Sequence, residues 1–212
     1  MNFDKIKNNT NIYLYAGTYI KSPINENNTI PFIGLQLQEC NNYNIQHNVL
    51  NKMDLYDNSV DIYQSEDVFE HIEYDSLDNV INEIYRVLKP GGLFRLSMPD
   101  YRCDVLYNRS EKNEKNEIIF DKGGGGDYDY ENKKVINGGH VWFPKYELVE
   151  TLLNKTNFEN SKIKYLHYYD INNNSVTRTI NYIKGYIERT PDNDKRVQNP
   201  YRVMSIVVDC YK

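Results

Sequence analysis

Two histidines are the side chains best suited to acid–base chemistry in this sequence of 212 residues. His71 directly follows Glu70, and His140 follows a Gly-Gly pair and stands two residues before Trp142, the single tryptophan. Because an imidazole titrates near neutral pH, either ring could remove the proton of a hydroxyl group during group transfer. A loop histidine such as His140 is a candidate for a substrate site. The Glu70–His71 pair has the alternative of packing beside a sheet and capping its loop.

Three further patterns carry less chemical meaning. Asp100 directly follows a predicted strand, so it could bind a substrate or cap the next helix. His71, Asp100 and His140 could converge on a cation, but the sequence has no close H-x-x-H or C-x-x-C pair, and we predict no metal site. The run Gly123–Gly126 lacks the Lys-Ser/Thr of a phosphate loop, which argues against a nucleoside triphosphatase.

The elements that must position these residues are clearest between residues 57 and 100. The turn tripeptide Asp57-Asn58-Ser59 precedes a predicted buried strand over 60–63. A helix is predicted next, with Asp75 or Ser76 as its cap and Pro90-Gly91-Gly92 as its stop. A strand over 93–98 follows and ends at Pro99-Asp100. The apolar residues of the helix recur at helical spacing: Leu77, Val80, Ile81, Ile84, Val87 and Leu88.

Strand, helix, glycine turn and strand form a βαβ unit, which predicts a parallel strand pair with a right-handed crossover. We therefore predict an α/β protein with a Rossmann-like, doubly wound, mostly parallel sheet. Its other strands are predicted over 11–15 and 32–37, with a weaker one over 45–50. Ligands of such sheets bind beyond the carboxyl ends of the strands, so the residues that follow each strand are candidates for a binding site.

The second half of the sequence continues the same plan. Pro144 begins a predicted helix, a strand is predicted over 163–169, and a second helix over 175–189. A final strand over 203–210, separated by a long excursion, suits an antiparallel C-terminal edge strand. Residues 108–137 are polar and glycine-containing, and we predict a flexible insertion there. The whole sequence, 1–212, is interpreted as a single domain.

The bulk composition excludes several classes of protein. The formal net charge is −5, which offers no basic surface of the kind that binds nucleic acid. No apolar run approaches the roughly 20 residues of a membrane helix. The three cysteines, Cys40, Cys103 and Cys210, are far apart and suggest reduced thiols. The polar start of the chain has no signal-peptide core, so a cytoplasmic protein without a membrane partner is expected.

Three segments of the sequence resemble the middle of class I S-adenosylmethionine-dependent methyltransferases. That family reads roughly D-N-S-F-D, then V-L-E-H, then E-x-x-R-V-L-K-P-G-G. The corresponding segments here are 57–61, 68–72 and 83–92. The branch that it most resembles is the small "predicted methyltransferases" that often accompany glycan-building genes. There, as in this sequence, a strand ends in Pro-Asp, and a His-x-Trp segment such as His140-Val141-Trp142 precedes a helix.

The resemblance implies S-adenosylmethionine as cofactor, bound across the carboxyl ends of the first, second and fourth strands. Tyr15-Ala16-Gly17 corresponds to the Gly-x-Gly turn of the family, with Tyr15 in place of the first glycine. Gln36 stands where an acidic residue commonly holds the ribose, and Asn48 where an aspartate lies near the adenine. Two residues that follow the strand over 60–63 complete the predicted cofactor site: Ser65 and Glu66.

These expectations favour one function and leave a second open. The first is methyl transfer to a hydroxyl of a small polar acceptor, with a sugar or glycan implied by the resemblance. His71 or His140 would be the base, and Asp100 and Trp142 would contact the acceptor. The alternative is a catalytically inactive methyltransferase-like module for binding or assembly, which the departures at Tyr15, Gln36 and Asn48 favour. A nicotinamide-dependent oxidoreductase predicts G-x-G-x-x-G after the first strand, and the sequence lacks it.

Overall fold

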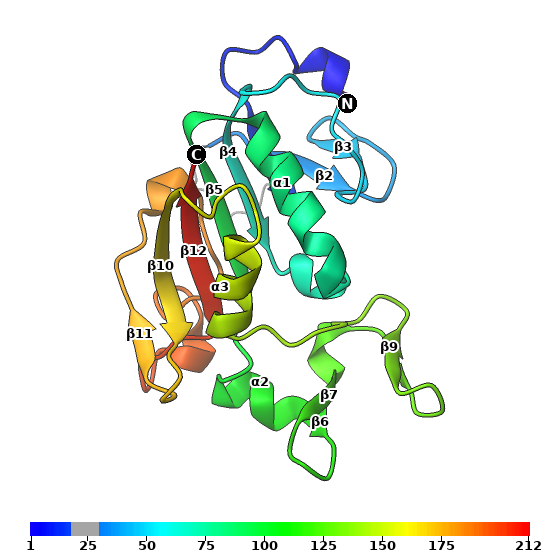
Figure 1. Ribbon diagram of the computed structural model, residues 1–212, viewed down its shortest axis with the longest axis vertical. Helices are drawn as coiled ribbons and strands as arrows, with labels where there is room; N and C mark the ends of the chain where they lie inside the picture. Colours follow the sequence, from blue (N-terminus) through cyan, green and yellow to red (C-terminus); the bar gives the residue numbers. More distant parts are fainter. Residues whose placement is uncertain (18–29) are drawn as a thin grey trace.

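The computed structural model describes residues 1–17 and 30–212 and contains one large sheet. Its eight strands run in the order β11-β10-β12-β5-β4-β1-β2-β3 (Figure 1). The pairs among β1 to β5 are parallel, and the pairs β5–β12, β12–β10 and β10–β11 are antiparallel. The bounds are β1 (Tyr13–Ala16), β2 (Ile33–Gln36), β3 (Asn44–Gln46), β4 (Val60–Glu66), β5 (Leu88–Pro99), β10 (Lys162–Tyr169), β11 (Ser175–Thr177) and β12 (Ser205–Tyr211).

The predicted βαβ unit is confirmed as β4, the helix α1 (Leu77–Val87) and β5. The apolar stripe of α1 is buried against the sheet, as its spacing predicts. The predicted cap is not formed: Ser76 occupies the N-cap position without a side-chain hydrogen bond, and a 3-10 turn, η4 (Tyr74–Ser76), leads into the helix instead. A second helix, α3 (Tyr146–Asn154), lies beside α1 on the same face of the sheet (Figure 1).

The C-terminal strand lies inside the antiparallel part of the sheet. Residues 205–211 pair with β5 on one side and with β10 on the other, so the outer edge belongs to the short strand β11. The predicted fold class, a Rossmann-like, mostly parallel sheet with an antiparallel C-terminal strand, is confirmed, but this strand lies two strands in from the edge at which it was predicted. β12 pairs with residues 93–99 of β5, and this register places Asp209 opposite Arg95 in the middle of the sheet.

The opposite face of the sheet near β4 and β5 is covered by a segment without an α-helix. Arg95 donates hydrogen bonds to the carbonyls of Asn181 (2.9 Å) and Gly185 (2.7 Å), and Gln64 Nε2 donates to the carbonyl of Tyr186 (2.6 Å). The helix predicted over 175–189 is therefore wrong. Gly185 has φ +133°, and a Cβ there would lie 2.0 Å from Gln64 Oε1, so the segment approaches the sheet more closely than a helix could.

The segment predicted to be a flexible insertion contains regular elements. The short helix α2 (Asp104–Arg109) precedes two small antiparallel hairpins that extend away from the sheet (Figure 1). The hairpins are β6 (Ser110–Lys112) with β7 (Ile118–Asp121), and β8 (Asp127–Asp129) with β9 (Lys134–Ile136); the 3-10 turn η5 (Lys122–Gly124) joins them. The mobility of this segment stays a prediction. Within the described residues, no helix has the length and apolar character needed to span a membrane.

Candidate functional site

A cavity of about 390 Å³ opens at the carboxyl ends of the parallel strands. Ligands of doubly wound sheets bind at this edge, so the sequence-based expectation of a site there agrees with the geometry. Three of the predicted cofactor residues, Gly17, Gln36 and Asn48, line it. The other lining residues are Leu35, Leu37, Gln38, His47, Val49, Leu50, Asp67, Val68, His71 and Ile72.

Gly17 forms the turn that leaves β1 at the cavity. Its φ of +97° disfavours any side chain, and its N–H donates to the carbonyl of Leu35 at 2.7 Å, which ties the ends of β1 and β2 together. A Cβ at this position would contact Val68 at 3.4 Å. The missing side chain therefore leaves room between β1 and the turn after β4, as the role of a phosphate- or cofactor-binding glycine requires.

Gln36 and Asn48 occupy the cavity rim with part of their hydrogen-bonding capacity already used. Gln36 Nε2 donates to the carbonyl of Glu39 at 2.7 Å, which orients the side-chain amide at the end of β2. Asn48 Oδ1 accepts from the N–H of Leu50 at 3.0 Å and is exposed. Neither side chain carries a charge, so both would hold a ligand by neutral hydrogen bonds only.

Four other predicted cofactor residues do not line the cavity. Tyr15 is half-buried and packs edge-on against Phe32, with ring centroids 6.1 Å apart. Ala16 and Ser65 are completely buried in adjacent strands, where they pair with each other in register. A direct contact of these residues, or of Glu66, with a cofactor stays a prediction.

Glu66 fixes a distant segment to the end of β4. Its Oε1 accepts hydrogen bonds from the N–H groups of Glu188 (2.8 Å) and Arg189 (3.2 Å), and Arg189 Nε lies 2.9 Å from Asp67 Oδ2. Burial, followed by the neighbouring charge of Asp67, raises the pKa of Glu66 to about 8. The chain that covers the second sheet face is therefore anchored directly beside the cavity.

The structure brings the two candidate bases together, although they are far apart in the sequence. The rings of His71 and His140 lie 4.6 Å apart, nearly perpendicular, and both face the carboxylate of Glu70. Burial, with the nearby His71 as second cause, lowers the pKa of His140 to about 3. A base with so low a pKa is a poor proton acceptor at neutral pH. Of the two histidines, His71 is also the one that lines the cavity.

Hydrogen bonds through buried polar groups connect His140 to Asp121. His140 Nδ1 contacts the hydroxyl of Tyr101, whose oxygen lies 2.6 Å from Asp121 Oδ2. Burial alone would raise the pKa of Asp121, but hydrogen bonds from Arg109 and Tyr101 outweigh it and leave the pKa below its usual value. The glycine run covers these groups closely: a Cβ on Gly124 would lie 2.6 Å from the His140 ring.

Sequence reasoning missed most of this cluster. Glu70 was named only as the neighbour of His71, yet it is fully buried, and burial together with Asp67 raises its pKa well above the usual range. Tyr101 and Asp121 carried no signal, because a residue's hydrogen bond to a side chain far along the sequence leaves no local pattern. The tight Gly123–Gly126 run near His140 was the available hint.

The two predicted acceptor contacts have different environments. Asp100 is fully buried, and its carboxylate accepts from the N–H groups of Arg102 (3.0 Å) and Tyr169 (2.8 Å), which joins the ends of β5 and β10. Trp142 is almost buried, and its Nε1 donates to the carbonyl of Phe69 at 3.0 Å. Acceptor binding by either residue stays a prediction, but only Trp142 borders an open cleft.

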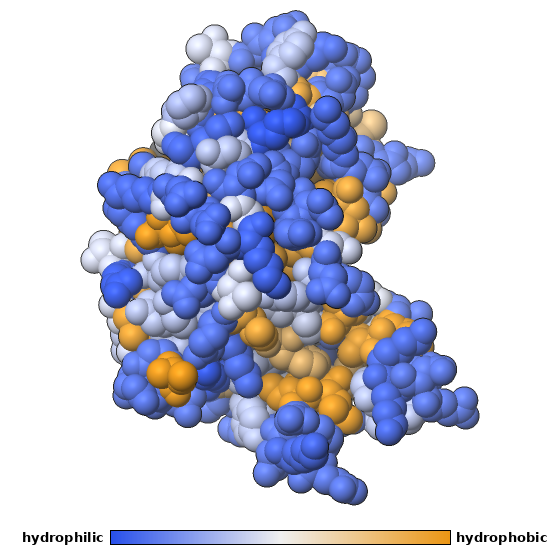
Figure 2. Space-filling view, viewed as in Figure 1, coloured by the Kyte–Doolittle hydropathy of each residue, from blue (hydrophilic) through white to orange (hydrophobic). Residues whose placement is uncertain are grey.

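That cleft has a volume of about 870 Å³ and lies between α3 and the hairpin β6–β7. Figure 2 shows apolar side chains gathered on the face where the hairpins meet the rest of the molecule. The lining combines rings with charged and polar groups: Tyr101, Arg102, Tyr107, Asn116, Glu117, Ile118, Trp142, Phe143, Lys145, Leu148, Ile171 and Asn173.

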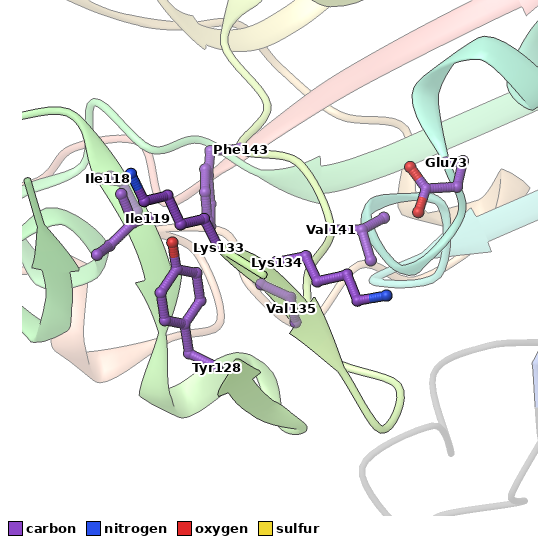
Figure 3. Close-up of a pocket in the computed structure, with 9 residues that line it drawn as sticks. All are labelled: Glu73, Ile118, Ile119, Tyr128, Lys133, Lys134, Val135, Val141 and Phe143. Atoms are coloured by element: carbon purple, nitrogen blue, oxygen red, sulfur yellow. The ribbon is translucent and has the colours of Figure 1, made fainter. Parts of the chain in front are cut away.

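A smaller neighbouring pocket, of about 350 Å³, lies between the two hairpins and the turn after β4 (Figure 3). Lys133 and Lys134 contribute its ammonium groups, and Glu73 contributes a carboxylate on the side of Val141. Phe143 borders both this pocket and the larger cleft, so the two are continuous along one wall.

Comparisons with known proteins agree with this architecture. A sequence family described as a methyltransferase domain matches residues 28–96. No curated protein matches the chain by sequence. The crystal structure of a SAM-dependent methyltransferase from Archaeoglobus fulgidus has a TM-score of 0.53 at 12% identity, over 99% of this chain and 90% of that one. One from Clostridium acetobutylicum has a TM-score of 0.53 at 13% identity, over 95% and 84%.

At these identities the likeness shows the fold. The resemblance predicted from the segments between residues 57 and 92 is confirmed, since the matching family covers them and the neighbours share the sheet that they help to build.

Proposed function

We propose that this chain, which has the fold of the class I methyltransferases, is an S-adenosylmethionine-dependent methyltransferase. The observation that carries the proposal is the cavity at the carboxyl ends of β1, β2 and β4, where Gly17, Gln36 and Asp67 meet. Both structural neighbours described above are named as dependent on this cofactor. The cavity's volume of about 390 Å³ is within the usual range for small-molecule sites, about 300–1,000 Å³.

The residues present fit such a cofactor, with neutral contacts in place of charged ones. Gly17 leaves space for close approach, Gln36 and Asn48 offer amides, and Leu35 and Val49 supply apolar wall. The cofactor supplies an activated methyl group when bound. The chain's task is then to align an acceptor with that group and to remove its proton. His71 lines the cavity and is the side chain positioned for the second task.

For the acceptor we propose a small polar molecule with a reactive hydroxyl, such as a sugar. The cleft beside Trp142 supports this, because aromatic rings and the polar groups of Arg102 and Lys145 share its lining. The sugar class itself rests on the sequence resemblance, which is an analogy. We propose a cytoplasmic location and no nucleic-acid partner on the composition alone.

Replacing Gly17 by alanine is expected to weaken the binding of S-adenosylhomocysteine by about tenfold or more, a loss of about 1.4 kcal/mol per factor of ten. The added Cβ would narrow the cavity between β1 and Val68. Isothermal titration calorimetry with S-adenosylmethionine and S-adenosylhomocysteine measures the affinity directly.

Gly91→Ala is the matched control. Gly91 also has positive φ (+79°), but a Cβ there would have no atom of the described residues within 4 Å, and the residue lies near the start of β5, far from the cavity edge of the sheet. Both substitutions should lower the free energy of unfolding by a similar amount, about 1–2 kcal/mol. Only Gly17→Ala should change the affinity for S-adenosylmethionine and S-adenosylhomocysteine. A wild-type chain that binds neither compound at millimolar concentration would contradict the proposed function.

A second candidate function, binding without catalysis, is favoured by a separate observation. The Glu66 carboxylate at the end of β4 is occupied by the backbone of Glu188 and Arg189, and the ribose position at the end of β2 holds the uncharged Gln36 instead of an acidic residue. These features favour a methyltransferase-like module that binds a ligand or partner without catalysis. Cofactor labelled on its methyl group distinguishes the two: a module would bind it and transfer no label to sugar, polyol or amine acceptors.

A further inference from the structure

We propose that Glu70, His71 and His140 bind a divalent transition-metal ion beside the cavity, since each of these side chains holds a possible ligand atom close to those of the other two. His140 Nε2 lies 3.5 Å from Glu70 Oε1, and His71 Nε2 lies 4.0 Å from the same oxygen. One ligand atom from each residue lies within 4.8 Å of the others. Tetrahedral ligands about 2.0–2.1 Å from zinc are themselves about 3.4 Å apart, so small side-chain movements would close the site.

The hydrogen-bonding partners of His140 determine which of its nitrogens faces Glu70 as an acceptor. Asp121 accepts from both Arg109 and Gly123, so it is an ionised carboxylate and cannot donate. The hydroxyl of Tyr101 must therefore donate its hydrogen bond to Asp121. Tyr101 can then only accept from His140 Nδ1, which carries the proton of the neutral ring. The lone pair of His140 is consequently on Nε2, the nitrogen turned to Glu70.

His71 reaches the same state by a simpler contact. Its Nδ1 lies 2.9 Å from the carbonyl oxygen of Gly138, which can only accept, so Nδ1 carries the proton. The lone pair of this ring is also on Nε2 and is turned to Glu70. Metal-binding histidines are commonly held in this way, by a hydrogen bond from the other ring nitrogen to a carbonyl or carboxylate.

The Glu70 carboxylate is the third acceptor group in this cluster, beside the Nε2 atoms of His71 and His140. The side chain of Glu70 is fully buried, and neither carboxylate oxygen has a hydrogen-bond partner among residues 1–17 and 30–212. Arg189, whose positive charge acts on Glu70, is paired with Asp67, and Arg109, whose charge acts on His140, is paired with Asp121. A buried carboxylate facing two lone pairs is costly unless a metal ion or a proton lies between them. A proton shared between Glu70 and His140 would need the two atoms to be closer than the 3.5 Å that separates Glu70 Oε1 from His140 Nε2.

The ligand set determines the class of ion. Two imidazole nitrogens and one carboxylate suit Zn²⁺, Co²⁺ or Fe²⁺, whereas Mg²⁺ prefers oxygen ligands alone. Three protein ligands leave at least one coordination position for water or another oxygen ligand. Because His71 belongs to both the cluster and the cavity wall, the ion would lie where a bound hydroxyl group can reach it. Resting on the proposed function, a bound ion would promote deprotonation of the acceptor in place of the His71 ring, because the ion would occupy the one lone pair of that ring.

The site is tested with the metals alone, on full-length protein that carries no polyhistidine tag. Chelator-stripped protein is titrated with Zn²⁺ against a chromophoric chelator, and with Co²⁺ while the visible absorption is recorded. We expect a single ion per chain for each metal, a Co²⁺ spectrum typical of nitrogen and oxygen ligands, and no competition from millimolar Mg²⁺.

Three variants assign the ligands: Glu70→Gln, His71→Asn and His140→Asn are each expected to weaken metal binding by more than the about 10–100-fold that outer-shell changes cause. The matched control is His167→Asn, a buried histidine in β10 outside the cluster, which should bind as the wild type does. Tyr101→Phe removes only the support of His140 and should show a smaller loss.

Wild-type protein that takes up no Zn²⁺ or Co²⁺ would overturn the proposal, as would variants that bind as tightly as the wild type. Circular dichroism of each stripped variant shows that it is folded, and Tyr101→Phe keeps the proposal testable if a ligand variant fails to fold. Failure of this proposal is distinguishable from failure of the proposed function, because metal uptake is measured without cofactor and cofactor binding is measured on stripped protein.

Discussion

Replacing Asp209 by alanine is expected to lower the free energy of unfolding by about 3–5 kcal/mol, the cost of leaving one member of a buried ion pair alone. Arg95 is completely buried, and its Nε and Nη2 donate to the two carboxylate oxygens of Asp209 at 2.7 and 2.8 Å. The remaining Nη1 holds Asn181 and Gly185 of the covering segment. Loss of Asp209 leaves the guanidinium with uncompensated charge in the middle of the sheet.

Urea unfolding followed by circular dichroism measures this change. Lys122→Ala is the control, because Lys122 pairs with Glu111 on the surface and should leave the unfolding midpoint unchanged. The double variant Arg95→Met with Asp209→Leu should recover part of the loss, since apolar replacements of a buried pair are often neutral. A single Asp209→Ala variant within about 0.5 kcal/mol of the wild type would contradict the role given to this pair.

The second large effect is expected at Trp142. Its replacement by alanine should lower the free energy of unfolding by about 3–5 kcal/mol, as is usual for a tryptophan removed from a core. Trp142 joins the main core cluster, packs edge-on against Tyr74 with ring centroids 5.0 Å apart, and donates its N–H to the carbonyl of Phe69. It therefore holds the loop that bears His140 against the turn that bears His71.

Trp142→Phe separates packing from the hydrogen bond. The carbonyl of Phe69 also accepts from the N–H of Ile72 at 3.2 Å, so it stays satisfied, and this variant should lose only about 1–2 kcal/mol. Urea unfolding of both variants, with the wild type as reference, tests whether Trp142→Ala loses more stability than Trp142→Phe. If both variants unfold like the wild type while acceptor binding is lost, Trp142 is a ligand contact without a role in stability.

The local signals of the sequence were reliable between residues 57 and 100. A glycine turn, an apolar stripe at helical spacing and two flanking apolar runs are short-range features, and the βαβ unit formed as they predict. The Gly17 turn and the place of Gln36 and Asn48 at the strand ends followed from the same plan. In contrast, residues 175–189 have some helical spacing, but the hydrogen bonds of Arg95, Gln64 and Glu66 hold this segment against the sheet without an α-helix.

Local sequence patterns could not predict the cluster around Glu70. The sequence suggested His71 and His140 as candidate bases and Asp100 only as a third residue that could converge with them on a cation. The structure places Asp100 against backbone amides at the ends of β5 and β10. Glu70 is the third residue beside the two histidines instead, because the 3-10 turn η3 (Phe69–His71) buries it.

The sequence by itself determined the α/β class, the βαβ unit and the edge of the sheet where the cavity lies, because each depends on apolar periodicity and turn residues within a few positions. The tertiary structure alone decided which polar side chains meet at that edge. Glu70, His140, Tyr101 and Asp121 come together because the glycine run packs over the His140 ring and excludes water. Burial then changes their chemistry, and burial is a property of contacts between segments that are distant in the chain.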